Sequence, residues 1–155
     1  MHDLGAGLVE MNPLLFDRLF VSRIEPHIPK DRLVFLFDYP IQLPCLAKKK
    51  KWAPFRERWE LYFRGLEIAN CYTEEDDPAE IKSFYENELR RKKQAHVSVN
   101  PDYELLALIE KRGFPASSGA ALGIDRLIMA LASITDIGGV ILFPFSDIVI
   151  SYNHP

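Results

Sequence analysis

Two glutamates, Glu60 and Glu67, are spaced so that they could act on one ion. They lie in the stretch Arg56 to Thr73, which reads RERWELYFRGLEIANCYT. If a tight turn at Arg64-Gly65 folds this stretch into a hairpin, the two side chains point to the same face as diagonal neighbours, about 7–8 Å apart. Long carboxylates at that spacing can converge on a hard cation such as Mg²⁺ or Mn²⁺. The alternative is a solvent-exposed face on which both glutamates are ordinary surface charges.

A run of small residues followed by an arginine is the second feature that could bind a ligand. Ser117 to Ser133 reads SSGAALGIDRLIMALAS. The small residues can form a strand whose backbone approaches a ligand closely, and the apolar run after Gly123 predicts a helix. Arg126 then lies in the first helical turn, beside backbone N–H groups that attract anions. This arrangement predicts a phosphate site, and the alternative is a core element with one surface arginine.

The hairpin is the element that must position the glutamates. Apolar residues at 59, 61 and 63 alternate with more polar ones, which is the periodicity of a strand. With a two-residue turn the predicted pairs are Phe63–Leu66, Tyr62–Glu67 and Glu60–Ala69.

The remaining elements are predicted from periodicity and from Pro and Gly punctuation. Helices are expected over residues 13–26, 78–93 and 101–111, and a short helical piece over 43–48. Leu33 to Phe37 predicts a buried strand, and Gly139 to Phe143 predicts a final one. Residues 1–12 and 147–155 are expected to be irregular.

Composition limits the classes of protein to which the chain can belong. Its 155 residues suit a single domain, and 48% hydrophobic with 26% charged residues is ordinary for a soluble globular protein. The net charge of −3 does not indicate nucleic-acid binding. Cys45 and Cys71 lie in unrelated segments, and no signal peptide or membrane-spanning run is visible. We therefore expect a reduced, cytoplasmic protein that does not enter a membrane.

A run of four lysines, Lys48 to Lys51, precedes Trp52. A basic run beside an aromatic residue can contact RNA. A solvated loop is the favoured interpretation, because the chain as a whole is acidic.

Two segments resemble the class II lysyl-tRNA synthetases and their paralogues. Gly119 to Met129, GAALGIDRLIM, resembles motif 3 of class II aminoacyl-tRNA synthetases, Gly-x-Gly-x-Gly-x-Asp-Arg-Leu-x-Met. Glu57 to Glu74, ERWELYFRGLEIANCYTE, is similar to the Glu-Arg-Phe-Glu…Gly-x-Glu-(Ile/Leu)-x-Asn-Gly-Phe-x-Glu segment of the lysyl enzymes. The resemblance implies an α+β fold, in which helices flank an antiparallel sheet as part of the synthetase catalytic core.

The resemblance also implies roles for individual residues. The arginine that matches Arg126 contacts the γ-phosphate of ATP, and Gly123 belongs to the same ATP-binding segment. The glutamates that match Glu60 and Glu67 hold the Mg²⁺ bound to ATP. The amino-acid pocket is lined by the positions that match Asn70, Tyr72 and Glu74, and the acidic one faces the distal ammonium of lysine.

Strict alternation conflicts with these implied roles, because it places Asn70, Tyr72 and Glu74 on the opposite face from Glu67. A β-bulge or a sharp twist near residues 68–70 is required to bring all of them to one site. We therefore expect one there.

The sequence also departs from the family pattern. Ala121 adds a methyl group where the lysyl enzymes have glycine at the floor of the amino-acid pocket, which resembles the paralogue that joins (R)-β-lysine to a lysine of elongation factor P. Cys71 replaces a family glycine, where it could crowd the pocket or shift Tyr72. Motifs 1 and 2 are absent, so residues 1–155 are expected to form one domain that corresponds to the C-terminal part of the catalytic domain.

The function that the resemblance implies is ATP-dependent activation of lysine or β-lysine, with transfer to elongation factor P. The alternatives are a lysine–tRNA ligase fragment that charges tRNA and a non-catalytic amino-acid- or ATP-binding remnant. A structural domain that has lost the site is a further alternative. Whether the chain is an enzyme by itself stays open, and a homodimer is possible.

Overall fold

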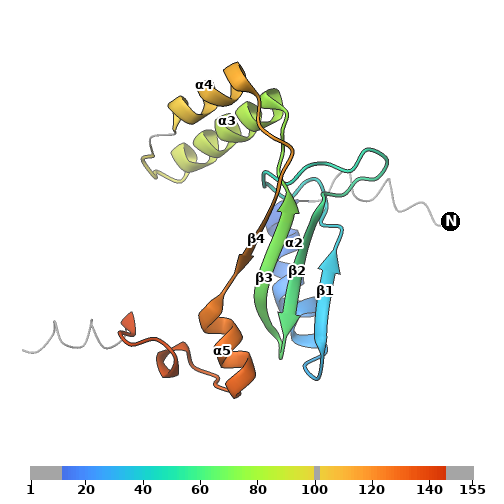
Figure 1. Ribbon diagram of the computed structural model, residues 1–155, viewed down its shortest axis with the longest axis vertical. Helices are drawn as coiled ribbons and strands as arrows, with labels where there is room; N and C mark the ends of the chain where they lie inside the picture. Colours follow the sequence, from blue (N-terminus) through green and yellow to red (C-terminus); the bar gives the residue numbers. More distant parts are fainter. Residues whose placement is uncertain (1–11, 100–101, 146–155) are drawn as a thin grey trace, which may run out of the picture.

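A four-stranded antiparallel sheet forms the centre of the computed structural model, which describes residues 12–99 and 102–145 (Figure 1). The strand order is β1-β2-β3-β4, so every strand pairs with its neighbours in the sequence. The strands are β1 (Leu33–Phe37), β2 (Arg58–Phe63), β3 (Leu66–Thr73) and β4 (Ser118–Leu122). Helices flank this sheet, which confirms the predicted α+β class.

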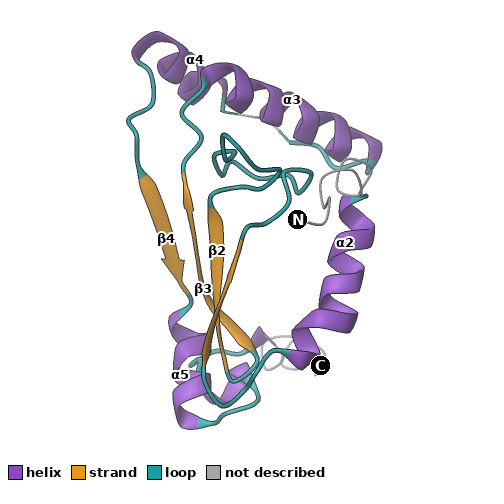
Figure 2. Cartoon of the chain, turned by 90° about the vertical axis from the view of Figure 1, so that its right-hand side faces the viewer, coloured by secondary structure: helices purple, strands orange, loops and turns teal. Residues whose placement is uncertain are grey.

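The helices lie at both ends of the sheet and along one face (Figures 1 and 2). α3 (Pro78–Gln94) and α4 (Tyr103–Arg112) pack together at one end, and α5 (Ile124–Ala132) lies at the other. α2 (Pro13–Leu19) stands beside the sheet and continues into the π-helix η1 (Phe20–Ile24) and the 3₁₀ turn η2 (Glu25–His27). Four of the predicted helices, including the one expected after Gly123, are thereby confirmed.

Capping residues in the sequence set where these helices begin. The side chains of Asn12, Asp77 and Asp102 accept hydrogen bonds from backbone N–H groups in the first turns of α2, α3 and α4. Such bonds satisfy donors that the helix itself leaves without a partner. α3 also ends in a basic last turn, which suits the dipole.

The predicted hairpin is present, with one change in its register. Arg64 and Gly65 form the turn with φ values of 52° and 79°, and Phe63 pairs with Leu66 as expected. The register then shifts, so that Leu61 faces Ala69 and Ile68 is left as an extra residue. The prediction that Glu60 pairs with Ala69 is wrong, because this β-bulge moves Glu60 opposite Asn70.

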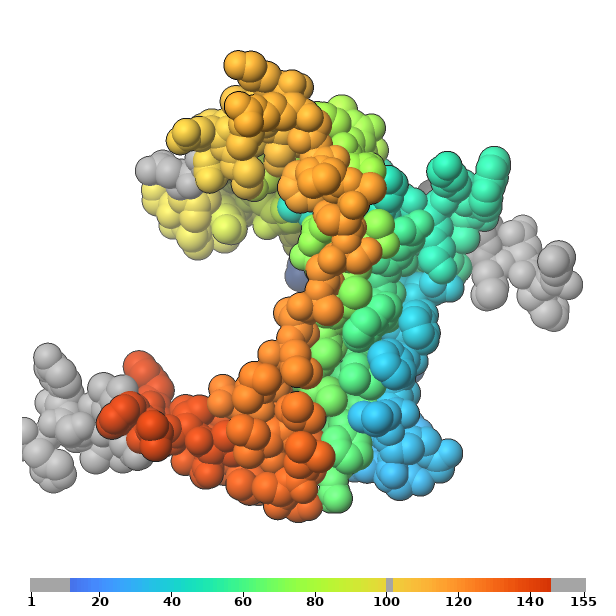
Figure 3. All heavy atoms as spheres, in the orientation of Figure 1, coloured from blue at the N-terminus to red at the C-terminus, as the bar shows by residue number. Residues whose placement is uncertain are grey.

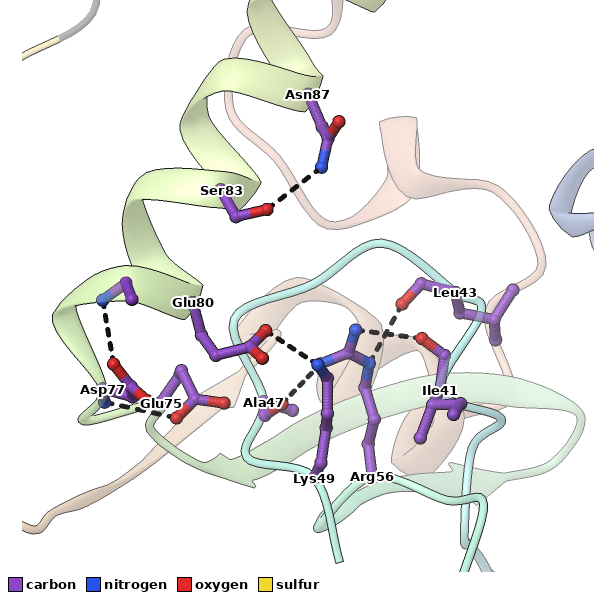
Figure 4. Close-up of polar contacts among 11 residues, drawn as sticks. Ile41, Leu43, Ala47, Lys49, Arg56, Glu75, Asp77, Glu80, Ser83 and Asn87 are labelled. Carbon is purple, nitrogen blue, oxygen red and sulfur yellow. Dashed lines mark hydrogen bonds and ion pairs between the residues drawn. The ribbon is translucent and has the colours of Figure 1, made fainter.

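The loop between β1 and β2 is held by a buried arginine rather than by a helix. The guanidinium of Arg56 donates to the carbonyls of Ile41 at 3.0 Å, Leu43 at 3.1 Å and Ala47 at 2.7 Å (Figure 4). The helical piece predicted over residues 43–48 is therefore wrong. Ala47 forms an isolated bridge with Glu74, and the carbonyls of Leu43 and Ala47 bond to the Arg56 side chain instead of to the N–H groups of a helix.

The lysine run belongs to this loop and forms ion pairs. Lys48 Nζ lies 2.6 Å from Asp76 Oδ1, and Lys49 Nζ lies 2.7 Å from Glu80 Oε2 on α3. Lys50 pairs with Asp38. The hydrogen bond from Lys48 lowers the pKa of Asp76. These ion pairs fit the solvated-loop interpretation, in which the lysines tie the loop to its surroundings.

The final strand predicted over residues 139–143 is also wrong. The 3₁₀ turn η3 (Ile137–Gly139) comes first, and Leu142 and Phe143 are 89% and 80% exposed. An apolar run of this length is typical of a buried strand, but the described sheet ends at β4 and does not pair with this segment.

Buried apolar side chains are few, and the largest described cluster lies away from the sheet. Ile81 of α3 packs with Leu106 and Ile109 of α4. The strand predicted over Leu33 to Phe37 is present as β1, but the expectation that it is buried is wrong, since Leu33, Phe35 and Phe37 are at least 47% exposed. Figure 3 shows a hollow where β4 runs between the α3–α4 pair and α5. In the described part of the chain, no helix is both long and apolar enough to cross a membrane.

Candidate functional site

The β-bulge gathers the predicted site residues on one face of the sheet. Two cross-strand rows result from the register. Arg58, Tyr72 and Gly119 form the first row, and Glu60, Asn70 and Ala121 form the second. Because the extra residue is Ile68, Glu67 faces the same way as Asn70 and Tyr72. The expected bulge is thus confirmed, and it lies at the predicted place.

Glu60 is buried in this face and accepts hydrogen bonds from three side chains. The Oη atoms of Tyr39 and Tyr62 donate to its Oε2 at 2.5 Å and 2.9 Å. Arg58 Nη2 donates to its Oε1 at 2.5 Å, and the Arg58 guanidinium also lies 4.5 Å from the centre of the Tyr39 ring. Burial, together with the Glu60 carboxylate, raises the pKa of both tyrosines well above the usual range.

These partners of Glu60 were missed in the sequence. Arg58 and Tyr62 lie two residues on either side of Glu60, so strand alternation alone could have found them. Tyr39 lies 21 residues before Glu60, beyond β1, and no local pattern connects the two residues.

Glu67 has looser contacts and faces a pocket. Arg126 Nη1 donates to the backbone oxygen of Glu67 at 3.1 Å and lies 3.5 Å from its Oε2. Asn70 Nδ2 lies 3.5 Å from Glu67 Oε1. The Glu67 side chain is 31% exposed, whereas that of Glu60 is 8% exposed. A carboxylate held this loosely can exchange its partners when a ligand arrives.

The pocket beside Glu67 has a volume of about 340 Å³. Five of the eight predicted site residues line it: Glu67, Asn70, Ala121, Gly123 and Arg126. Gly123 is the N-cap of α5, and its N–H donates to the carbonyl of Ile68 at 2.9 Å. The first turn of α5 is therefore fixed to the bulge, and its positive end lies at the pocket.

Glu74 and Tyr72 lie further along the same face, outside the lining of that pocket. The Glu74 N–H donates to the carbonyl of Ser117 at 3.0 Å, and Ala47 forms a bridge with Glu74 on its other side. Burial, and then the charge of Glu74, raise the pKa of Tyr72. The carboxylate of Glu74 comes close to Gly119 of β4.

Cys71 does not enter this face. It pairs with Trp59 on β2 and with Ala120 on β4, so it belongs to the opposite face of the sheet from Asn70 and Tyr72. The expectation that Cys71 could crowd the pocket is therefore wrong, because strand alternation turns it away.

The acidic groups could supply a cation with two carboxylates. Among the described residues, no three His, Cys, Asp or Glu side chains are grouped so that they could hold a metal ion. A carboxylate offers about four lone-pair sites, of which Glu60 uses three. Glu67 is the freer of the two, since its contacts are near the limit of hydrogen-bond distance.

Comparison with known proteins points to one family. The sequence model of the family described as "tRNA synthetases class II (D, K and N)" matches residues 20–147. The "Elongation factor P--(R)-beta-lysine ligase" of Edwardsiella ictaluri (strain 93-146) is 40% identical over 131 residues, which are 83% of this chain and 40% of that protein. The protein of the same name from Proteus mirabilis (strain HI4320) is 36% identical over 141 residues, 90% of this chain and 43% of the relative.

A second kind of relative is the "Lysine--tRNA ligase" of Anaeromyxobacter sp. (strain K). It is 35% identical over 121 residues, which are 77% of this chain and 24% of that protein. The chain therefore spans about two fifths of the β-lysine ligases and about a quarter of the tRNA ligase.

The family match includes every element that positions the site, from η1 through the hairpin to α5. It covers well over half of the chain and agrees with the resemblance of both sequence motifs. The chain belongs to the class II tRNA synthetase family (D, K and N).

Proposed function

We propose that this chain takes part in the ATP-dependent activation of lysine or β-lysine. The observation that carries the proposal is the β-bulge at Ile68, which turns Glu67, Asn70 and Tyr72 to one face. An anion-attracting helix end and Arg126 lie at one end of that face, and Glu74 lies at the other. This polarity suits phosphate groups at one end of the site and an ammonium group at the other.

In the proposed reaction, a carboxylate oxygen of the amino acid attacks the α-phosphorus of ATP in line. The new bond gives an aminoacyl-adenylate, and the bond from the α-phosphorus to the bridging oxygen breaks to release pyrophosphate. Arg126 is assigned to the γ-phosphate end, where its charge offsets that of the leaving group. It must then give up its contact with Glu67, which is long enough to exchange.

Mg²⁺ is the cation proposed for the ATP phosphates, and Glu60 and Glu67 are its proposed protein ligands. When bound, it would offset the negative charge of the phosphates. The freer carboxylate of Glu67 and the remaining lone pair of Glu60 are compatible with this role. Arg58 and the two tyrosines hold the Glu60 carboxylate in position on the sheet.

The amino acid is proposed to lie along β3 and β4. Glu74 receives the distal ammonium, Tyr72 supplies an aromatic wall, and Asn70 faces Ala121 across the strands. The methyl group of Ala121 narrows the pocket at the end near Gly123. One methyl group in a tight pocket is worth about 1–3 kcal/mol of discrimination.

The acceptor is proposed to be a lysine amine of elongation factor P. Both β-lysine ligases described above carry that acceptor in their names, and Ala121 fits the altered substrate. Transfer to tRNA is the second possibility, because a lysine–tRNA ligase matches at a similar identity. A cytoplasmic location and a homodimeric assembly belong to the same proposal.

ATP–pyrophosphate exchange with Mg²⁺ tests the activation step. We expect exchange that depends on the amino acid, prefers (R)-β-lysine to α-lysine and disappears in Arg126→Ala. Absence of exchange with either amino acid, from protein shown to be folded, would contradict catalysis by this chain.

A non-catalytic binding role is the second candidate function. The observation that favours it is the internal pairing of both proposed cation ligands, Glu60 with Arg58 and Glu67 with Arg126. Equilibrium binding together with the exchange assay separates the two candidates, because a non-catalytic role gives Mg²⁺-dependent ATP binding without exchange.

A further inference from the structure

Gly119 has no side chain at the point where the Glu74 carboxylate approaches β4. A Cβ built on Gly119 would lie 2.8 Å from Glu74 Oε1, closer than such atoms come in proteins. Apart from chain neighbours, that oxygen is the one described atom within 4 Å of this position. The space that the missing side chain leaves is therefore occupied by the carboxylate.

Backbone conformation does not explain the glycine. Gly119 pairs with Tyr72 in β4, and it is not among the described residues with a positive φ. Any L-residue can adopt such a conformation. Gly123 provides a contrast on the same segment, since a Cβ there would meet its nearest atom at 3.7 Å, an ordinary contact.

The backbone of Glu74 is fixed, so only its side chain can respond to a change at Gly119. The Glu74 N–H bonds to Ser117, and the bridge to Ala47 holds the other side. Arg56 in turn fixes the Ala47 carbonyl at 2.7 Å. A methyl group at position 119 must therefore move the Glu74 carboxylate away from its place against β4.

We propose that Gly119 sets the length of diamino acid that the site accepts, by letting the Glu74 carboxylate lie against β4. This inference rests on the proposed function, since it takes Glu74 to be the partner of the distal ammonium. The rows at Gly119 and Ala121 lie two residues apart on one strand, about 7 Å. That separation suits the four-carbon side chain of lysine.

The length of the site does not separate α-lysine from β-lysine. Both are six-carbon chains with the carboxylate at one end and the distal ammonium at the other, and only the position of the proximal ammonium differs. Gly119 therefore acts on chain length, whereas Ala121 acts on the position of the proximal ammonium.

Equilibrium binding of L-lysine and L-ornithine, which is one methylene shorter, tests the inference. We expect the wild-type chain to prefer lysine and Gly119→Ala to weaken lysine binding about tenfold, a typical effect of one methylene. Ornithine binding should change much less, so the preference narrows or reverses. Ala120→Ser, which enlarges the neighbouring residue on the opposite face, is the matched control and should keep the wild-type preference.

A double-mutant cycle shows whether the methyl group acts through Glu74. Gly119→Ala should have little further effect on lysine binding in a Glu74→Gln background, because the charged partner is already lost. Additive effects, or an unchanged preference in Gly119→Ala, would overturn the inference while leaving the proposed function intact. If the wild-type chain binds neither amino acid, the proposed function fails and the inference fails with it.

Discussion

Glu60 and Glu67 lie on one face of one hairpin, but the protein holds them in different ways. Glu60 is buried and accepts hydrogen bonds from Tyr39, Tyr62 and Arg58. Glu67 is partly exposed, and its ion pair with Arg126 is 3.5 Å long. The first carboxylate is part of the interior, and the second is part of the pocket.

The difference shows how one hairpin can hold two residues of the same type with different rigidity. A buried charge is tolerated only when its partners satisfy it, so Glu60 cannot lose one without cost. An exposed pair contributes little to stability and can be exchanged for a ligand. Substitutions at the two glutamates should therefore separate stability from binding.

The largest effect is expected for Glu60→Gln. The amide removes the negative charge that pairs with Arg58, and its NH₂ group cannot accept the hydrogen bonds that the neighbouring side chains donate. We therefore expect the free energy of unfolding to fall by about 3 kcal/mol. Urea unfolding followed by circular dichroism measures it. A loss below about 1 kcal/mol would show that the Glu60 cluster is not a buried charge network.

Tyr39→Phe should have the next largest effect. It keeps the ring, which lies 6.5 Å from that of Phe20, and removes only the donor to Glu60. A hydrogen bond to a charged group is worth about 1.5–3 kcal/mol, and we expect the lower value. The same unfolding experiment checks it, with Tyr85→Phe on α3 as a control outside the cluster. Equal losses in the two variants would contradict the assigned role of Tyr39.

Alkaline pH should weaken the Glu60 cluster. Burial and the Glu60 carboxylate hold the pKa of Tyr39 and Tyr62 above their ordinary 10.0. Their contribution is fully present below pH 10 and is lost as the pH rises further, because the unfolded chain then releases protons that the folded chain keeps. We expect stability to fall above pH 10, and to fall less in the Tyr39→Phe/Tyr62→Phe double variant. A similar pH profile for both proteins would refute this.

The smallest effect on stability is expected for Glu67→Gln. We expect a change within about 0.5 kcal/mol, as for an exposed pair. Its effect should appear instead in binding, as a loss of the Mg²⁺ dependence of ATP affinity measured by calorimetry. Unchanged Mg²⁺ dependence would remove Glu67 from the proposed cation site.

Local signals in the sequence were sufficient for much of the fold. The Arg64-Gly65 turn and the capping aspartates of α3 and α4 each act within a few residues, and the structure has both features. The loop over residues 38–57 depends on Arg56 reaching carbonyls 9 to 15 residues away. No periodicity encodes such contacts, so the helical piece predicted there was wrong.

The site was predictable to a similar extent. The bulge was expected only because the motif needed Asn70 and Glu67 on one face, whereas alternation alone gave the wrong pairing for Glu60. The role of Tyr39 depends on the pairing of β1 with β2, which brings distant segments together. The proximity of Gly119 to Glu74 could not be predicted from the sequence, since the two residues are 45 positions apart.

The extra residue at Ile68 decides to which face of the sheet each later side chain of β3 points. Substitutions along β3 change one side chain at a time, so their effects on the site can be graded. Removing a single residue between Glu67 and Asn70 would restore strict alternation and turn every later side chain of β3 to the other face. This segment can therefore accept substitutions, but the insertion or deletion of a single residue would disrupt the site.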